Sequence, residues 1–231
     1  MEEKDVICIY LHGDRRQTPG RDLTAREAAA RQKELSHRLL EEAAGRYQEW
    51  KGVPCRKPES DGWRIRRAEH GKPFFAEYPE IHFSISHSGS CWGCAFSGQP
   101  VGLDIQLRRV SRTAPEKDGS GKEAEQEMGK DRDAERIRRI SDRFFHPDEQ
   151  EWLERGGDFF AVWAAKESYV KYTGEGMKRS FDGFAVAEKA GLLSSVKADG
   201  ASGRLYHRQL SPFYSLCLCA ERIEEVHFFH I

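Results

Sequence analysis

Two polar side chains interrupt an apolar strand pattern in Val101-Gly102-Leu103-Asp104-Ile105-Gln106. Because successive strand residues point to opposite faces, Asp104 and Gln106 are expected on one face, with their bases roughly 7 Å apart. Oxygens from both could converge on one small cation. An edge strand with solvated polar side chains would give the same pattern, so the segment alone leaves both interpretations open.

A second candidate segment runs from Trp163 to Lys171 and has helical spacing. Trp163 and Val170 fit a buried stripe, whereas Glu167 and Lys171 are four residues apart and therefore neighbours on one face. A surface ion pair would explain that spacing. A carboxylate that binds metal beside an ammonium that holds phosphate would explain it equally well.

A third segment, 81–89, carries a strand into a turn rich in serine and histidine and gathers several hydrogen-bond donors. Gly71-Lys72-Pro73 precedes it. This is not a P-loop, because Arg66 replaces the first glycine and Pro73 replaces the Ser or Thr. The Cys91/Cys94 pair has redox or zinc spacing, but thiols three apart on a strand face opposite ways, so we predict buried structural thiols.

Strands, helices and one charged insertion are expected to carry these segments. A capping-box spacing from Thr24 to Glu27 predicts a helix that ends near Trp50, and Gly174 should end a second long helix. Further strands are expected at 6–11, 63–67, 81–86, 91–96, 101–107, 214–220 and 226–231, with a short helix from His146. Without regular βαβ spacing, these elements indicate an α+β fold.

The chain divides by composition into an N-terminal half at 1–107, a charged segment at 108–139 and a C-terminal half at 140–231. Residues 112–135 are nearly free of apolar side chains, which predicts a flexible insertion.

Charge and hydropathy narrow the function classes. Lys and Arg total 37 against 38 Asp and Glu, a formal net charge of −1, so nothing global indicates nucleic-acid binding. No apolar run approaches the ~20 residues that span a bilayer, and the acidic start is not a secretory signal. We therefore expect a cytoplasmic protein without a membrane segment.

Taken together, G-K-P-F, F-S-I-S-H-S, V-G-L-D-I-Q, F-F-H-P-D-E and W-A-A-K-E-S-Y-V-K resemble, in order and spacing, the 4′-phosphopantetheinyl transferase superfamily of the surfactin-synthetase-activating type. The resemblance implies two similar α/β halves with pseudo-twofold symmetry around coenzyme A and Mg²⁺. It also implies transfer of the 4′-phosphopantetheine arm to a serine of an apo acyl or peptidyl carrier protein, as in a holo-[acyl-carrier-protein] synthase. Adenosine 3′,5′-bisphosphate would leave, and a monomer would hold the whole site.

The resemblance also implies roles for single residues. Asp104, Glu167 and Gln106 would bind the metal, and Glu167 would also take the serine proton. Gln106 stands where the family commonly has Glu. Lys171 would contact the donor phosphates, and Lys166 lies in the same motif as a further donor contact. The nucleotide end and its 3′-phosphate would be held by Lys72, Pro73, Ser86 and His87. Ser84 stands where the family often has Asn.

Two other functions stay open at this point. One is an Mg²⁺-dependent phosphotransferase that acts on a small molecule and needs no carrier protein. The other is a non-catalytic carrier-binding module of the same fold. Gln106 favours that module, whereas Asp104, Glu167 and Lys171 argue against it.

Overall fold

The computed structural model describes residues 6–13, 25–52, 63–108, 134–176, 179–200 and 202–231. Its helices are α1 (Ala25–Trp50), a helical stretch at 134–144, α3 (Pro147–Glu154), α4 (Phe159–Thr173) and a 3-10 turn at Phe181–Gly183. Its strands are β1 (Val6–His12), β2 (Ile65–Arg67), β3 (Pro73–Phe75), β4 (His82–Ser88), β5 (Cys91–Ser97), β6 (Val101–Leu107), β7 (Phe184–Glu188), β8 (Gly191–Ala198), β9 (Arg204–Ser211), β10 (Tyr214–Ala220) and β11 (Glu225–His230).

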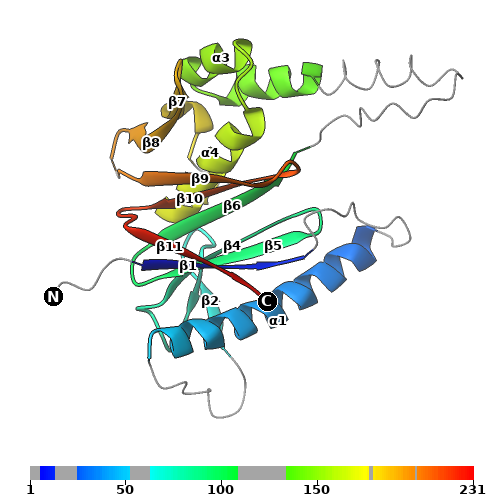
Figure 1. Cartoon of the computed structure of the whole chain (residues 1–231), viewed down its shortest axis with the longest axis vertical. Helices are drawn as coiled ribbons and strands as arrows, with labels where there is room; N and C mark the ends of the chain where they lie inside the picture. The colour runs from blue at the N-terminus through cyan, green and yellow to red at the C-terminus, as the bar shows by residue number, and fades with distance from the viewer. Residues whose placement is uncertain (1–5, 14–24, 53–62, 109–133, 177–178, 201) are drawn as a thin grey trace, which may run out of the picture.

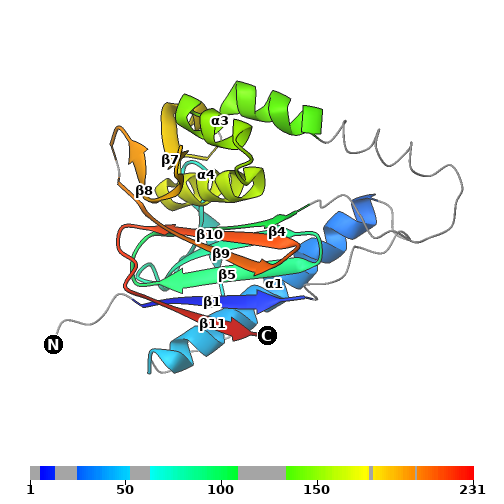
Figure 2. The same cartoon turned by 45° about the horizontal axis from the view of Figure 1, so that its top comes forward.

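Two sheets form the middle layers of the molecule. The first has the order β11-β1-β5-β4 and the second β6-β10-β9-β8-β7, while β2 and β3 form a separate hairpin. In Figures 1 and 2, α1 covers the outer side of the first sheet, and α3 and α4 cover the second. The order of layers is therefore helix, sheet, sheet, helix, which confirms the α+β class.

Three apolar cores hold these layers together. The central core lies between the sheets and includes Ile9, Leu103 and Leu218. The second lies between α1 and the first sheet, and the third lies between α4 and the second sheet. Cys91 belongs to the central core and Cys94 to the core under α1, so the two thiols face opposite ways as predicted. Both are buried and free of disulfides.

The two sheets exchange strands between distant parts of the chain. β6 pairs antiparallel with β10, and the C-terminal β11 pairs parallel with β1. The expected halves at 1–107 and 140–231 are therefore interleaved, because each contributes a strand to the other's sheet. Of the expected insertion, 109–133 lie outside the described residues, whereas 134–139 belong to the helical stretch.

Helix α4 begins and ends as its sequence predicts. Asp158 caps its N-terminus by accepting the N–H groups of Phe160 and Ala161, and Gly174 ends it with φ of 75°. Gly102 brings α4 against β6, since a Cβ there would lie 1.9 Å from the Ser168 carbonyl oxygen. This close backbone approach places the side chains of α4 beside the polar face of β6.

Candidate active site

Asp104 lies on the face of β6 that α4 covers, and it is only 3% exposed. Its Oδ1 accepts hydrogen bonds from Lys171 Nζ at 2.7 Å and from Ser86 Oγ at 2.9 Å. Its Oδ2 accepts one from Gln106 Nε2 at 2.6 Å. The expectation that Asp104 and Gln106 share a face is confirmed, and side chains from β4, β6 and α4 meet at one carboxylate.

Glu167 approaches the same place from α4. Its side chain lines a cleft and is partly buried. Burial raises its pKa above the ordinary value, the negative charge of Asp104 raises it further, and Lys171 opposes both effects. A partly buried carboxylate whose charge is disfavoured by a neighbouring carboxylate forms a site that a cation would stabilise.

The two lysines that were expected at phosphates both bind protein oxygens in this structure. Besides Asp104, Lys171 Nζ donates to the Leu103 carbonyl at 3.1 Å, so it forms no simple surface pair with its helix neighbour Glu167. Lys72 Nζ donates to the carbonyls of Tyr172 at 2.8 Å and Val101 at 3.2 Å. Burial lowers the pKa of Lys72 to about 8.

A cleft of about 880 Å³ opens beside these groups. One wall comes from the β2–β3 hairpin and β4, and the other from α4 and the segment after it. Of the residues proposed at the site, the cleft is lined by Lys72, Pro73, His87, Glu167 and Lys171. Segments distant in sequence therefore meet at one cleft.

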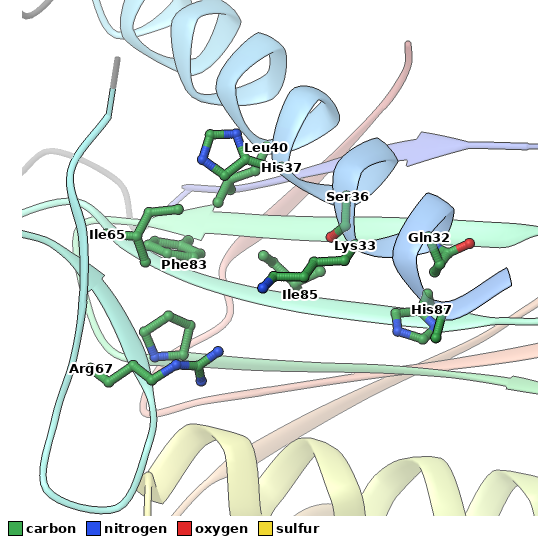
Figure 3. A pocket seen from close by; sticks show the side chains of 12 residues that line it. Gln32, Lys33, Ser36, His37, Leu40, Ile65, Arg67, Phe83, Ile85 and His87 are labelled. Atoms are coloured by element: carbon green, nitrogen blue, oxygen red, sulfur yellow. The ribbon is translucent and has the colours of Figure 1, made fainter. Parts of the chain in front are cut away.

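A narrower groove of about 390 Å³ continues the cleft along β4, under α1. Figure 3 shows Lys33 and Arg67 directing their charged groups into the space between α1 and the hairpin, with His87 farther along β4. His87 and Arg67 line both hollows. The combined surface is long, because the two hollows share lining residues, and basic, because Lys33, Arg67, Lys72 and Lys171 line it.

Lys166 does not reach this surface, so its expected contact with the donor is wrong. Its side chain is 0% exposed and forms an ion pair of 2.8 Å with the equally buried Glu149. It also donates to the carbonyls of Phe181 and Phe184 at 2.5 and 2.8 Å. The lysine is turned about 100° around α4 from Glu167, and its ammonium group is enclosed by Glu149 and the carbonyls of Phe181 and Phe184.

Ser86 is also placed differently from the expectation. It is buried, its hydroxyl donates to Asp104, and its oxygen accepts the Ile105 N–H at 3.0 Å. These bonds direct the side chain toward β6, so the expected contact with the nucleotide end is not supported.

Several residues of the cleft were not expected from sequence. Lys33 and Arg67 gave no distinguishing signal, because charged residues are frequent around both. Trp163, placed by its spacing in the buried stripe, is only partly buried and lines the cleft with Phe144 and Phe181. Val170 is buried as expected and also reaches the cleft wall.

The donor set fits a magnesium ion held jointly with a substrate. Mg²⁺ is usually bound through one or two carboxylates together with substrate phosphates, and Asp104 and Glu167 supply that number. Over the described ranges, no group of three or more His, Cys, Asp or Glu side chains could hold a metal by itself.

The order of the five motifs along the chain and their meeting at one cleft are typical of a known superfamily of proteins. The chain belongs to the 4′-phosphopantetheinyl transferase superfamily, whose family model matches residues 100–219, just over half of the sequence. This confirms the resemblance drawn from the five motifs. Among the described helices, none is long and apolar enough to cross a membrane.

Curated relatives support the surfactin-synthetase-activating type within that superfamily. The chain is 29% identical over 160 residues, 68% of its length, to 4′-phosphopantetheinyl transferase Sfp of Bacillus subtilis strain 168. It is 31% identical over 57% of its length to a 4′-phosphopantetheinyl transferase of Bacillus subtilis, and 34% identical over 49% to 4′-phosphopantetheinyl transferase gsp of Aneurinibacillus migulanus. These matches span 62%, 51% and 39% of the respective relatives.

Proposed function

We propose that this protein transfers the 4′-phosphopantetheine arm of coenzyme A to a serine hydroxyl of an apo acyl or peptidyl carrier protein. Adenosine 3′,5′-bisphosphate is the second product. The observation that carries the proposal is the convergence of Asp104, Glu167 and Lys171 beside a long basic cleft. The names of the curated relatives support the same reaction.

The cleft suits an elongated donor with phosphates at two places. Lys171 would meet the pyrophosphate, since its side chain lines the cleft and its ammonium group binds Asp104. Lys72 lines the same cleft beside Pro73, toward the nucleotide end. The groove beyond, with Lys33, Arg67 and His87, offers positive charge and hydrogen-bond donors to the nucleotide end and its 3′-phosphate. Pro73 borders the same groove.

Charge neutralisation and proton removal are the two tasks of the site. Asp104 and Glu167 would hold Mg²⁺, which neutralises charge on the pyrophosphate when bound. Lys171 is placed to stabilise negative charge on the phosphate that leaves. Glu167, with its raised pKa, is suited to accept the serine proton as the serine oxygen bonds to the phosphorus that carries the pantetheine arm.

The proposal extends to partners and location. All of these residues come from one chain, so a monomer could hold the complete site. A holo-[acyl-carrier-protein] synthase activity would make an acyl carrier protein the acceptor, whereas a peptidyl carrier protein would assign the enzyme to peptide assembly. A cytoplasmic location stays a prediction from the sequence.

Mass spectrometry tests the proposal directly. Apo carrier proteins of the fatty acid, polyketide and peptide types are incubated with the protein, coenzyme A and Mg²⁺. We expect a gain of one phosphopantetheine on at least one carrier, and no gain on its variant that lacks the acceptor serine. Absence of labelling on every carrier, while coenzyme A still binds, would contradict the transferase activity and favour a carrier-binding module.

A further inference from the structure

The edges of the two sheets meet along β4 and β6 without pairing through their backbones. In the described strands, β4 pairs with β5 and β6 pairs with β10. Between the two edges, serine hydroxyls of β4 accept backbone N–H groups of β6. The three bonds run from Leu103 to Ser84 at 2.9 Å, from Ile105 to Ser86 at 3.0 Å, and from Leu107 to Ser88 at 2.9 Å.

We call these three bonds the serine ladder. Every bond joins residues 19 apart, so β4 and β6 run in the same direction, in register. The serines alternate along β4 with Phe83 and Ile85, which pack on the side of α1. A buried N–H without an acceptor costs free energy, so the ladder replaces the missing strand at the edge of β6.

A serine that accepts an N–H still has a proton to donate. Ser86 donates it to Asp104 Oδ1 at 2.9 Å, in a bond buried from solvent. Ser84 and Ser88 make the same kind of bond to β6, and their described contacts with it involve no carboxylate. Ser86 is therefore the serine of the ladder that links the contact between β4 and β6 to the Asp104 carboxylate.

We propose that Ser86 is a positioning residue whose hydroxyl orients the Asp104 carboxylate for metal binding, a role that rests on the proposed function. The Ile105 N–H fixes the serine oxygen, and the fixed oxygen directs its proton at Oδ1. Together with the bonds from Lys171 and Gln106, this bond limits rotation of the Asp104 carboxylate about its side-chain bonds. Ser86 itself contacts neither donor nor acceptor substrate.

The three serines supply their own matched controls. Replacement by alanine removes one N–H acceptor in each case, so Ser84→Ala, Ser86→Ala and Ser88→Ala should share a loss of stability. Only Ser86→Ala also removes a hydrogen bond to the Asp104 carboxylate, which then keeps its bonds from Lys171 and Gln106. We expect about tenfold weaker binding of Mn²⁺, used as a spectroscopic probe of the metal site, to the Ser86→Ala complex with coenzyme A. The complexes of the other two variants should change less than twofold.

Donor binding without metal distinguishes positioning from direct contact. Coenzyme A and dephospho-coenzyme A should bind Ser86→Ala as they bind the wild type. Transfer should show a lower kcat with an unchanged KM for coenzyme A, and Ser86→Thr, which keeps the hydroxyl, should recover metal affinity. Should Ser86→Ala fail to fold, Ser86→Cys provides a thiol of similar size that donates poorly.

Three results with the serine variants would overturn the proposal. The first is unchanged Mn²⁺ affinity in Ser86→Ala, or in Ser86→Cys where that variant replaces it. The second is an equal loss of Mn²⁺ affinity in all three alanine variants. The third is that Ser86→Ala no longer distinguishes coenzyme A from dephospho-coenzyme A. A wild-type complex that binds no Mn²⁺ would also overturn it. Failure of the wild type to label any carrier contradicts the proposed function instead, because the metal titrations do not require an acceptor.

Discussion

At the scale of single residues, the site is organised around one carboxylate with three donors. Lys171, Ser86 and Gln106 together occupy both oxygens of Asp104. Gln106 contributes a neutral amide here, so the positive charge of Lys171 is the nearest compensation for Asp104. A metal ion must replace part of this arrangement, and the missing negative charge at position 106 makes that replacement harder.

Gln106→Glu should therefore tighten Mg²⁺ binding to the protein without substrate. A unit charge ~4 Å from a divalent ion is worth several kcal/mol at an effective dielectric near 20, and desolvation offsets much of this. The wild type should bind Mg²⁺ weakly alone and acquire it with coenzyme A, whose pyrophosphate supplies charge. Calorimetric Mg²⁺ titration with and without coenzyme A measures both effects. Gln209→Glu, on β9, controls for added charge, and tight Mg²⁺ binding by the free wild type would refute this reasoning.

Glu167→Gln should abolish transfer, because it removes a metal ligand and the group expected to accept the serine proton. Folding should be retained, since the amide has nearly the same shape. Carrier labelling followed by mass spectrometry measures the loss, and circular dichroism checks the fold. Glu154→Gln, at an exposed position on α3, is the control and should label normally. An active Glu167→Gln enzyme would remove Glu167 from the mechanism.

Lys72 should make donor binding depend on pH. Burial lowers its pKa to about 8, so its ammonium is present below that pH and is lost as pH rises through it. Phosphate favours the charged form, so coenzyme A binding at pH 8.5 should be accompanied by proton uptake. Calorimetry in buffers of different ionisation enthalpy measures that uptake. It should disappear in Lys72→Met, and equal uptake in that variant would assign the proton to another group.

At the scale of elements, a buried ion pair fixes α4 to α3. Glu149 accepts from Lys166 and from the backbone N–H groups of Val186 and His146, at 2.8, 2.7 and 2.9 Å. Burial raises the pKa of Glu149, and these donors oppose that effect. Lys166 directly precedes Glu167 in the sequence. The orientation of α4 at the site therefore depends on the ion pair between Lys166 and Glu149.

Glu149→Gln should destabilise the protein by about 3–5 kcal/mol, because it leaves the Lys166 ammonium buried without its counter-charge. The double variant Glu149→Gln/Lys166→Met should recover part of the loss. Urea unfolding measures both. Glu151→Gln, on the same helix but in exposed ion pairs, is the control and should change stability little. Equal changes in the free energy of unfolding for Glu149→Gln and Glu151→Gln would show that the buried pair stabilises the protein no more than an exposed pair does.

Most of the helices and strands could be predicted from the sequence. Alternation placed Asp104 and Gln106 correctly on β6, and helical spacing together with Asp158 and Gly174 gives the bounds of α4. Motif position could not distinguish Lys166 from Glu167, which are adjacent in sequence but lie on different faces of the helix. The partner that buries Lys166 is 17 residues away on another helix, and no local pattern reveals such a pairing. The role of Ser86 was hidden for the same reason, because its partners lie on β6.

At the scale of the whole molecule, the halves exchange strands. The N-terminal β6 completes the sheet under α4, and the C-terminal β11 extends the sheet under α1. β11 also adds Phe229, which stacks on Tyr10 at 5.0 Å between ring centroids. The cleft lies between these interleaved parts, so its walls are joined by both exchanged strands and by the serine ladder. Local periodicity predicts each strand but not which sheet receives it.

The strand exchange predicts that the two halves fold only together. A fragment of residues 1–108 lacks β11 and leaves β6 without its partner β10, while a fragment of residues 134–231 lacks both β1 and β6. Each alone should therefore be unfolded by circular dichroism, whereas a mixture should form a folded complex that binds coenzyme A. The matched control is 134–221, which lacks β11, the three residues before it and Ile231. It should associate at least tenfold more weakly, because β1 then becomes an uncovered sheet edge and Phe229 no longer packs on Tyr10. Independent folding of either fragment, or equal association of 134–221 and 134–231, would show that the exchanged strands do not couple the halves.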